Sequence, residues 1–129
     1  MTLQVQNVCF HRLPMQTRFP FRYGIASMTE CPYLTVTVDV EVDGKTVSGM
    51  SADGLPPKWF TKDPETTFEE DDLPGMLQAV RHAANLSVGV GQSSDFFAWW
   101  KDVYEGQAAW ADENQIPPLL ALHRRLSTT

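Results

Sequence analysis

This 129-residue sequence lacks an apolar stretch long enough to span a bilayer, and its N-terminus lacks the charged-then-apolar pattern of a secretory signal. Positive charge is also scarce. Ten Lys and Arg residues against sixteen Asp and Glu give a formal net charge of -6, and the basic residues form no continuous run. Nucleic acids and anionic membranes both require a positive protein face, so we expect neither as a partner. We expect a cytoplasmic protein.

Cysteine is nearly absent, with only Cys9 and Cys31 in the whole chain. The two residues flank one aromatic stretch, and their spacing alone does not exclude a disulfide bond. Because a secretory pattern is lacking, we favour two reduced, partly buried thiols.

Motifs of catalysis and metal binding are also scarce. Residues 49–53 (Gly-Met-Ser-Ala-Asp) lack the second glycine of a nucleophile elbow, and no helix follows them directly. The three histidines, His11, His82 and His123, have no metal-ligand spacing. The acidic run 69–72 lies on consecutive residues, which point in different directions on a helix, so we interpret it as a solvated helix face. We therefore expect no catalytic residue and no metal site in this chain.

The N-terminal part has the pattern of a three-stranded antiparallel β-meander within residues 1–52. Residues 3–12 predict a first strand, and a change in the apolar phase near Asn7 predicts a bulge or twist. Residues 34–42 alternate strictly, which is typical of a half-buried strand. Asp43-Gly44 is a hairpin turn signal, so residues 45–52 are predicted to form the return strand.

Residues 63–129 have helical periodicity and complete a single α+β domain over residues 1–129. Asp63 is predicted to cap a helix, with Pro74 marking a new start or a kink. Ser94 is predicted to cap another helix, and residues 119–126 form a third, short amphipathic piece. The predicted buried stripe of the first helix is Leu73, Met76, Leu77, Val80, Ala83 and Ala84. That of the second is Phe96, Phe97, Trp100, Val103, Tyr104, Ala108 and Ala111, with Trp99 and Trp110 off it.

Two loops are predicted to lie side by side. The first, residues 18–30, combines aromatic rings with two arginines, and the second, residues 53–62, follows the return strand. The hairpin turn lies at the far end of the meander, so the return strand ends where the first loop re-enters the sheet. Two interpretations of the first loop stay open: it folds its aromatic rings onto the core of its own domain, or it forms a functional surface.

The string Phe19-Pro20-Phe21-Arg22-Tyr23-Gly24, with Met28-Thr29, Asp43-Gly44 and Gly49 after it, resembles one family. It is similar to the N-terminal capping domain of enolase-superfamily enzymes of the mandelate racemase and muconate lactonizing type, most clearly up to about residue 85. The resemblance implies a three-stranded antiparallel meander followed by a bundle of three or so helices. These enzymes are Mg²⁺-dependent racemases, cycloisomerases and dehydratases. Their Mg²⁺ ligands and acid/base residues lie in a (β/α)₈ barrel that the capping domain covers.

The resemblance thus implies a truncated or isolated capping domain that binds no cofactor itself and is inactive without the barrel. Its loops at 18–30 and 52–62 would contact a small carboxylate substrate, with aromatic rings excluding water and basic groups meeting the anion. A barrel domain or a second copy would cover the apolar face. The alternative is a stand-alone module that binds a small anionic ligand or oligomerises through the loops at 18–30 and 53–62. The candidate contacts are Arg18, Phe21, Arg22, Tyr23, Lys58 and Trp59.

Overall fold

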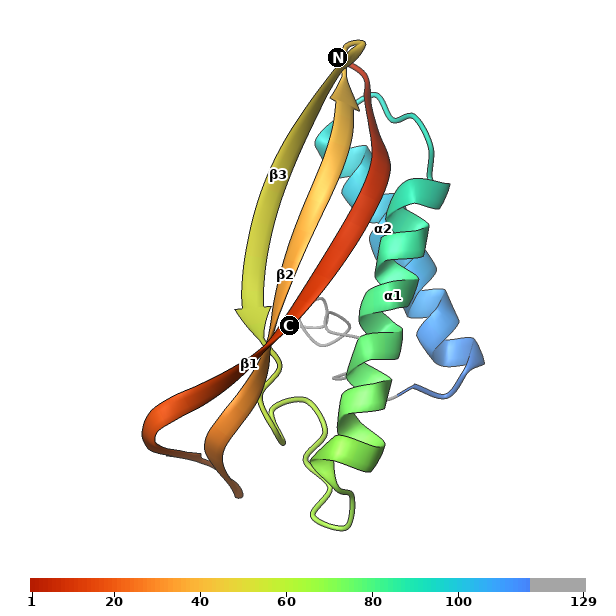
Figure 1. Ribbon diagram of the computed structural model, residues 1–129. Helices are drawn as coiled ribbons and strands as arrows, with labels where there is room; N and C mark the ends of the chain where they lie inside the picture. The colour runs from red at the N-terminus through yellow and green to blue at the C-terminus, as the bar shows by residue number, and fades with distance from the viewer. Residues whose placement is uncertain (117–129) are drawn as a thin grey trace.

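The computed structural model describes residues 1–116 (Figure 1). Strands β1 (Leu3–Tyr23), β2 (Ala26–Val42) and β3 (Lys45–Gly54) form an antiparallel sheet in the order β1-β2-β3. A π-helical turn (Phe68–Asp72) leads into α1 (Leu73–Gly89), and α2 (Phe96–Glu113) follows. Helix α1 packs against β1 and α2 packs against α1. The predicted α+β class is confirmed, with two helices in the described part, and the predicted piece 119–126 lies outside the described residues.

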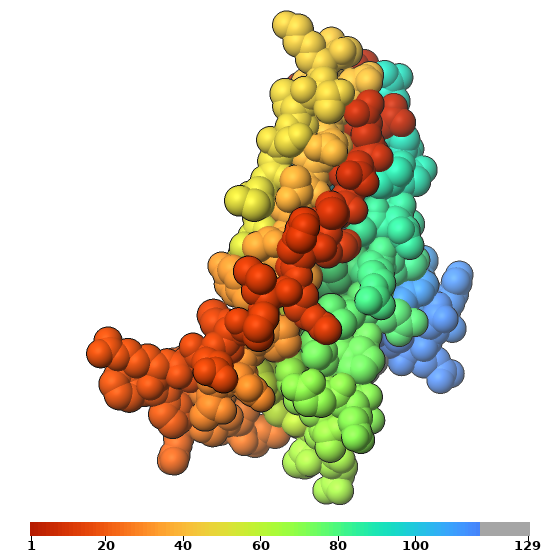
Figure 2. Space-filling view, in the orientation of Figure 1, coloured from red at the N-terminus to blue at the C-terminus, as the bar shows by residue number. Residues whose placement is uncertain are grey.

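The hairpin of β1 and β2 is longer than predicted and projects beyond the rest of the sheet (Figures 1 and 2). The two strands stay paired out to Tyr23 and Ala26, so the prediction of an irregular loop over residues 18–30 is wrong. Aromatic side chains favour extended backbone, and Gly24 supplies the positive φ, +52°, that the turn needs. The pairing is irregular at one place, where residues 17–20 of β1 bulge opposite Thr29.

The sheet has one face toward the helices and one polar face. A register shift between Val5 and Asn7 confirms the predicted bulge. Leu3, Val5 and Leu34 are buried, whereas Val36 to Val42 are only half-buried because α1 contacts the β1 side of the sheet. On the polar face, side chains bond across the strands: Gln6 with Glu41, Asn7 with Asp39, and Ser48 with Asp39.

Helix α1 begins later than predicted. Asp63 caps no helix; its Oδ1 instead accepts a hydrogen bond from the Glu65 backbone N–H at 2.9 Å within a loop. Regular α-helix starts at Leu73 with Pro74 in the first turn, so the predicted restart at this proline is confirmed. Leu73 and Met76 then form the core with Leu34 and Leu55.

Helix α2 buries only part of the predicted stripe: Ala111 is buried, whereas three aromatic residues near the start of the helix are exposed. Asp95, not Ser94, caps it, and its Oδ1 accepts the Ala98 N–H at 2.8 Å. Phe96, Phe97 and Trp100 are 62%, 66% and 44% exposed.

The inward face of α2 is instead narrow and partly polar. The Trp110 ring stacks on His82 at 4.2 Å, and Trp99 Nε1 donates to the Ser87 carbonyl at 3.1 Å. Gln107 is buried, donating to the Ala79 carbonyl at 2.9 Å and meeting His82 Nδ1 through its Oε1 at 2.6 Å. The apolar pattern did not predict the role of Gln107, because a polar residue with satisfied hydrogen bonds occupies the centre of the helix contact.

Candidate functional site

Tyr23 joins the tip of the β1–β2 hairpin to the segment that follows β3. Its hydroxyl donates a hydrogen bond to the Pro57 carbonyl. Its ring lies edge-on to Trp59, with centroids 5.8 Å apart, and 5.5 Å from the ring of Phe21. The segments predicted to lie side by side are therefore in contact, and Phe21, Tyr23 and Trp59 form one aromatic cluster.

Beside this cluster lies a cavity of about 360 Å³, which we call the two-segment cavity. Most of its lining is apolar, and Asp53 is the one Asp, Glu, Lys or Arg among the lining residues. The lining residues are Met15, Phe21, Tyr23, Met28, Cys31, Asp53, Gly54, Pro56, Trp59 and Phe60. Such a cavity suits an apolar or aromatic group better than a free anion.

A second, larger hollow of about 800 Å³ lies between the hairpin and the start of the helical part. It shares Met15 and Cys31 with the two-segment cavity, but its lining is more charged. The ionisable groups around it, Cys31 aside, are Arg12, Glu30, Glu69 and Glu70.

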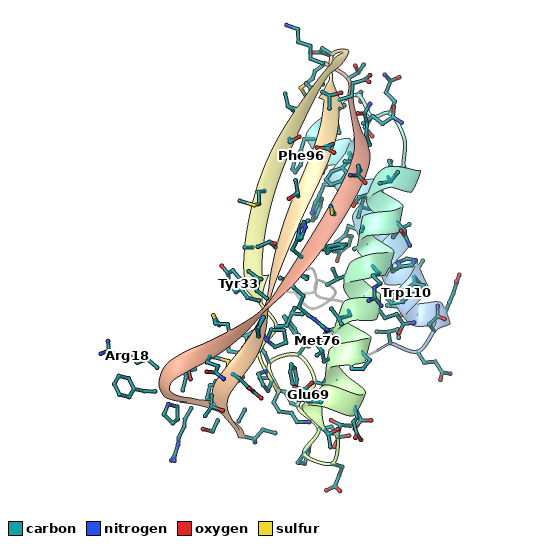
Figure 3. The ribbon with its side chains drawn as sticks, viewed as in Figure 1. Arg18, Tyr33, Glu69, Met76, Phe96 and Trp110 are labelled. Atoms are coloured by element: carbon teal, nitrogen blue, oxygen red, sulfur yellow. The ribbon has the colours of Figure 1, made fainter. Side chains whose placement is uncertain are left out.

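The two predicted arginines do not line either hollow. Arg18 lies at the outer end of the hairpin (Figure 3), with its guanidinium 5.7 Å from the ring centroid of Phe19. Arg22 is exposed and lies between Phe21 and Tyr23 on a strand, so its side chain leaves the opposite face of the hairpin. The structure thus brings together the predicted aromatic residues and separates them from the predicted arginines.

Lys58 has an internal role rather than the predicted contact with an anion. Its ammonium lies 2.9 Å from Asp72 Oδ2, 2.6 Å from the Asp63 carbonyl and 2.7 Å from Thr66 Oγ1. The two charged side chains are only 14% and 2% exposed, and the Thr66 hydroxyl also donates to Asp72 Oδ1 at 2.8 Å. These bonds tie the loop that carries Trp59 to the beginning of the helical part. The ammonium is therefore not available to a ligand.

The interpretation of residues 69–72 as a solvated face is wrong for Asp72, which is buried beneath Lys58. The two charges are not at helical spacing, and Lys58 has a left-handed backbone, with φ at +57°. Periodicity in the sequence therefore does not predict that Lys58 and Asp72 form a pair.

Both cysteines are free thiols, as predicted, although Cys9 is exposed and only Cys31 is buried. Burial raises the pKa of Cys31, hydrogen bonding from the Leu55 backbone lowers it, and the carboxylate of Asp53 raises it further. The Cys31 thiol donates to the Pro32 carbonyl at 3.2 Å. Burial also raises the pKa of Tyr23, with Cys31 as the second cause. Both groups therefore remain protonated at neutral pH and act as donors, not nucleophiles.

No family model, no curated protein and no solved structure matches this chain.

Within residues 1–116, no three His, Cys, Asp or Glu side chains gather in a group that would hold a metal ion. No helix of that part is long and apolar enough to cross a membrane. The two-segment cavity presents aromatic rings, thioethers and one carboxylate to a ligand.

Proposed function

We propose that this chain acts as a capping domain of the mandelate racemase and muconate lactonizing type. The observation that carries the proposal is the contact of Tyr23 with Pro57 and Trp59, which unites two segments over one cavity at one end of the sheet. In such a domain the two segments cover a substrate, whereas the Mg²⁺ ligands and the acid/base groups belong to a barrel domain.

The lining of the cavity indicates which part of a substrate the cap would hold. Phe21 and Trp59 are 57% and 53% exposed, so their rings are accessible to a partner. Together with Met15 and Met28 they would surround the apolar end of a small carboxylate and exclude water from it. The carboxylate itself would point to the barrel, because burying it beside Asp53 would place two like charges together. Arg18 and Arg22 would meet an anionic group only on the outer side of the hairpin tip.

Two activity measurements test this proposal. The purified chain with Mg²⁺ and a panel of small carboxylates should give no turnover. The same chain, joined to the barrel of a mandelate racemase or muconate lactonizing enzyme from which the native cap has been removed, should restore turnover above that of the barrel alone. Turnover by the chain alone, or a joined protein that is folded and no more active than the bare barrel, would contradict the proposal.

The size of the two-segment cavity favours a second candidate function, a stand-alone module for small ligands. About 360 Å³ falls in the range of ligand pockets, roughly 300–1,000 Å³. A thermal-shift screen of the full chain with small carboxylates tests it. A saturable shift that is lost in Trp59→Ala and in Arg22→Ala supports an anion-binding module. A shift that is lost only in Trp59→Ala would place the ligand in the cavity and remove the arginine from its site.

A further inference from the structure

Among residues 1–116, no strand pairs with the outer edge of β3. β3 lies on the side away from α1 (Figures 1 and 2), and every residue from Lys45 to Asp53 is exposed. Two of them are large apolar residues, Val47 at 53% and Met50 at 78% exposure. Open edges present unpaired backbone groups and readily accept another strand.

The turn at Asp43-Gly44 determines which backbone groups face outward. Val42 and Lys45 flank this two-residue turn and form the first hydrogen-bonded pair, and pairs along β2 and β3 then alternate. The β3 residues that bond to β2 are therefore Lys45, Val47, Gly49, Ser51 and Asp53. Those whose N–H and C=O groups point away from the sheet are Thr46, Ser48, Met50 and Ala52.

A second copy of β3 is a suitable antiparallel partner for this edge. The outward-facing residues must lie opposite one another, and the registers centred on Ser48, Gly49 or Met50 pair at least three of the four in this way. Only the register with Gly49 opposite Gly49 places Lys45 directly opposite Asp53 of the partner subunit, once at each end. Opposite charges in this position stabilise a strand pair, whereas in the neighbouring registers the lysine has no carboxylate opposite it.

We propose that two copies of this chain form a two-fold dimer through β3, with Gly49 at the axis and two Lys45–Asp53 pairs across the interface. The dimer would join the two sheets into one six-stranded sheet. Asp53 also lines the two-segment cavity, so Lys45 of the partner subunit would place a positive charge at the cavity's rim. The proposal rests on the strand edge and not on the capping function.

Charge reversal tests the dimer. Light scattering on the full chain should give about twice the single-chain mass of 14.5 kDa. Lys45→Glu and Asp53→Lys should each raise the dissociation constant about tenfold or more, because each change puts like charges opposite each other twice. The double variant Lys45→Glu/Asp53→Lys should restore the dimer, and Lys62→Glu, off the edge, should leave it unchanged. A wild-type chain that stays monomeric at high concentration, or a folded double variant that stays dissociated, overturns the proposal.

Single cysteines test the register. In a Cys9→Ser background, Gly49→Cys should form a disulfide-linked dimer under mild oxidation, because only this position faces its own copy in the proposed register. The substitution fits, since no atom lies within 4 Å of the added Cβ. Ser48→Cys and Met50→Cys are matched controls for the two neighbouring registers and should remain mostly uncrosslinked. Preferential crosslinking at either control position, or at none of the three, contradicts the register.

Discussion

Replacing Lys58 by Met should destabilise the domain far more than the loss of an ordinary surface lysine. Methionine keeps the length and the apolar stem but removes the ammonium, which lies 2.9 Å from the carboxylate of Asp72. Because Asp72 is only 2% exposed at its side chain, water does not replace the lost partner. The carboxylate would keep one hydrogen bond, from Thr66 Oγ1.

Breaking a buried pair from one side costs about 3–5 kcal/mol, a large part of the ~5–15 kcal/mol stability of a domain. For a chain of this size the unfolding temperature should fall by roughly 10–20 °C. Thermal unfolding followed by circular dichroism measures it. The matched control is Lys62→Met, which removes a lysine whose Nζ lies 5.8 Å from the Trp59 ring centroid and should cost less than about 0.5 kcal/mol.

The double variant Lys58→Met/Asp72→Asn separates charge pairing from packing. Removing both charges leaves no buried ion, so most of the lost stability should return. If the double variant were as unstable as the sum of the two single variants, the ion pair would not be what holds this loop, and the reasoning would be refuted.

Other contacts give smaller, equally specific effects. Tyr23→Phe removes the hydrogen bond to Pro57 and should cost about 1 kcal/mol in chemical unfolding, with a change in Trp fluorescence; no loss of stability would argue against the bond. Iodoacetamide at pH 8 should alkylate the exposed Cys9 in the native protein and Cys31 only after unfolding; equal rates would contradict its burial. Since burial raises the pKa of both Cys31 and Tyr23, the unfolded chain loses these protons at lower pH than the folded one. The free energy of unfolding should therefore fall as the pH rises from the ordinary thiol pKa upward, and a constant value there would be inconsistent with those shifts. Gln107→Leu should lower the free energy of unfolding by about 1–3 kcal/mol, because it leaves the Ala79 carbonyl and His82 Nδ1 unpaired. An unchanged midpoint of chemical unfolding would contradict these hydrogen bonds.

Local patterns predicted the meander well. The alternation over residues 34–42, the Asp43-Gly44 turn and the phase change near Asn7 are each determined by neighbours in the chain, and all three features are present. Pairing of the predicted segments also followed from connectivity, because antiparallel strands return to the same end of the sheet. The two segments therefore lie side by side as expected, and the structure shows that Tyr23 and Trp59 are the rings in contact there.

The features that the sequence did not predict depend on contacts between residues far apart in the chain. The stretch that begins at Arg18 contains proline and glycine, which are typical of loops. Pairing with β2 nevertheless keeps it extended up to Tyr23. On α2, Phe96, Phe97 and Trp100 of the predicted stripe are exposed, whereas Gln107 is buried in the contact with α1 with its hydrogen bonds satisfied. Lys58 was predicted to contact an anionic ligand. Its pairing with Asp72 was not predicted, because the two residues are not at helical spacing.

The kinetics of the joined cap and barrel test the central claim, that the two segments contact the substrate together. Trp59→Ala should raise KM for a carboxylate with an apolar end by about tenfold or more, as expected when a hydrophobic contact is lost. Phe19→Ala removes an aromatic ring that is 72% exposed on the same hairpin but outside the cavity, and it should leave KM unchanged. Equal KM values for the wild type and for both variants would contradict the claim.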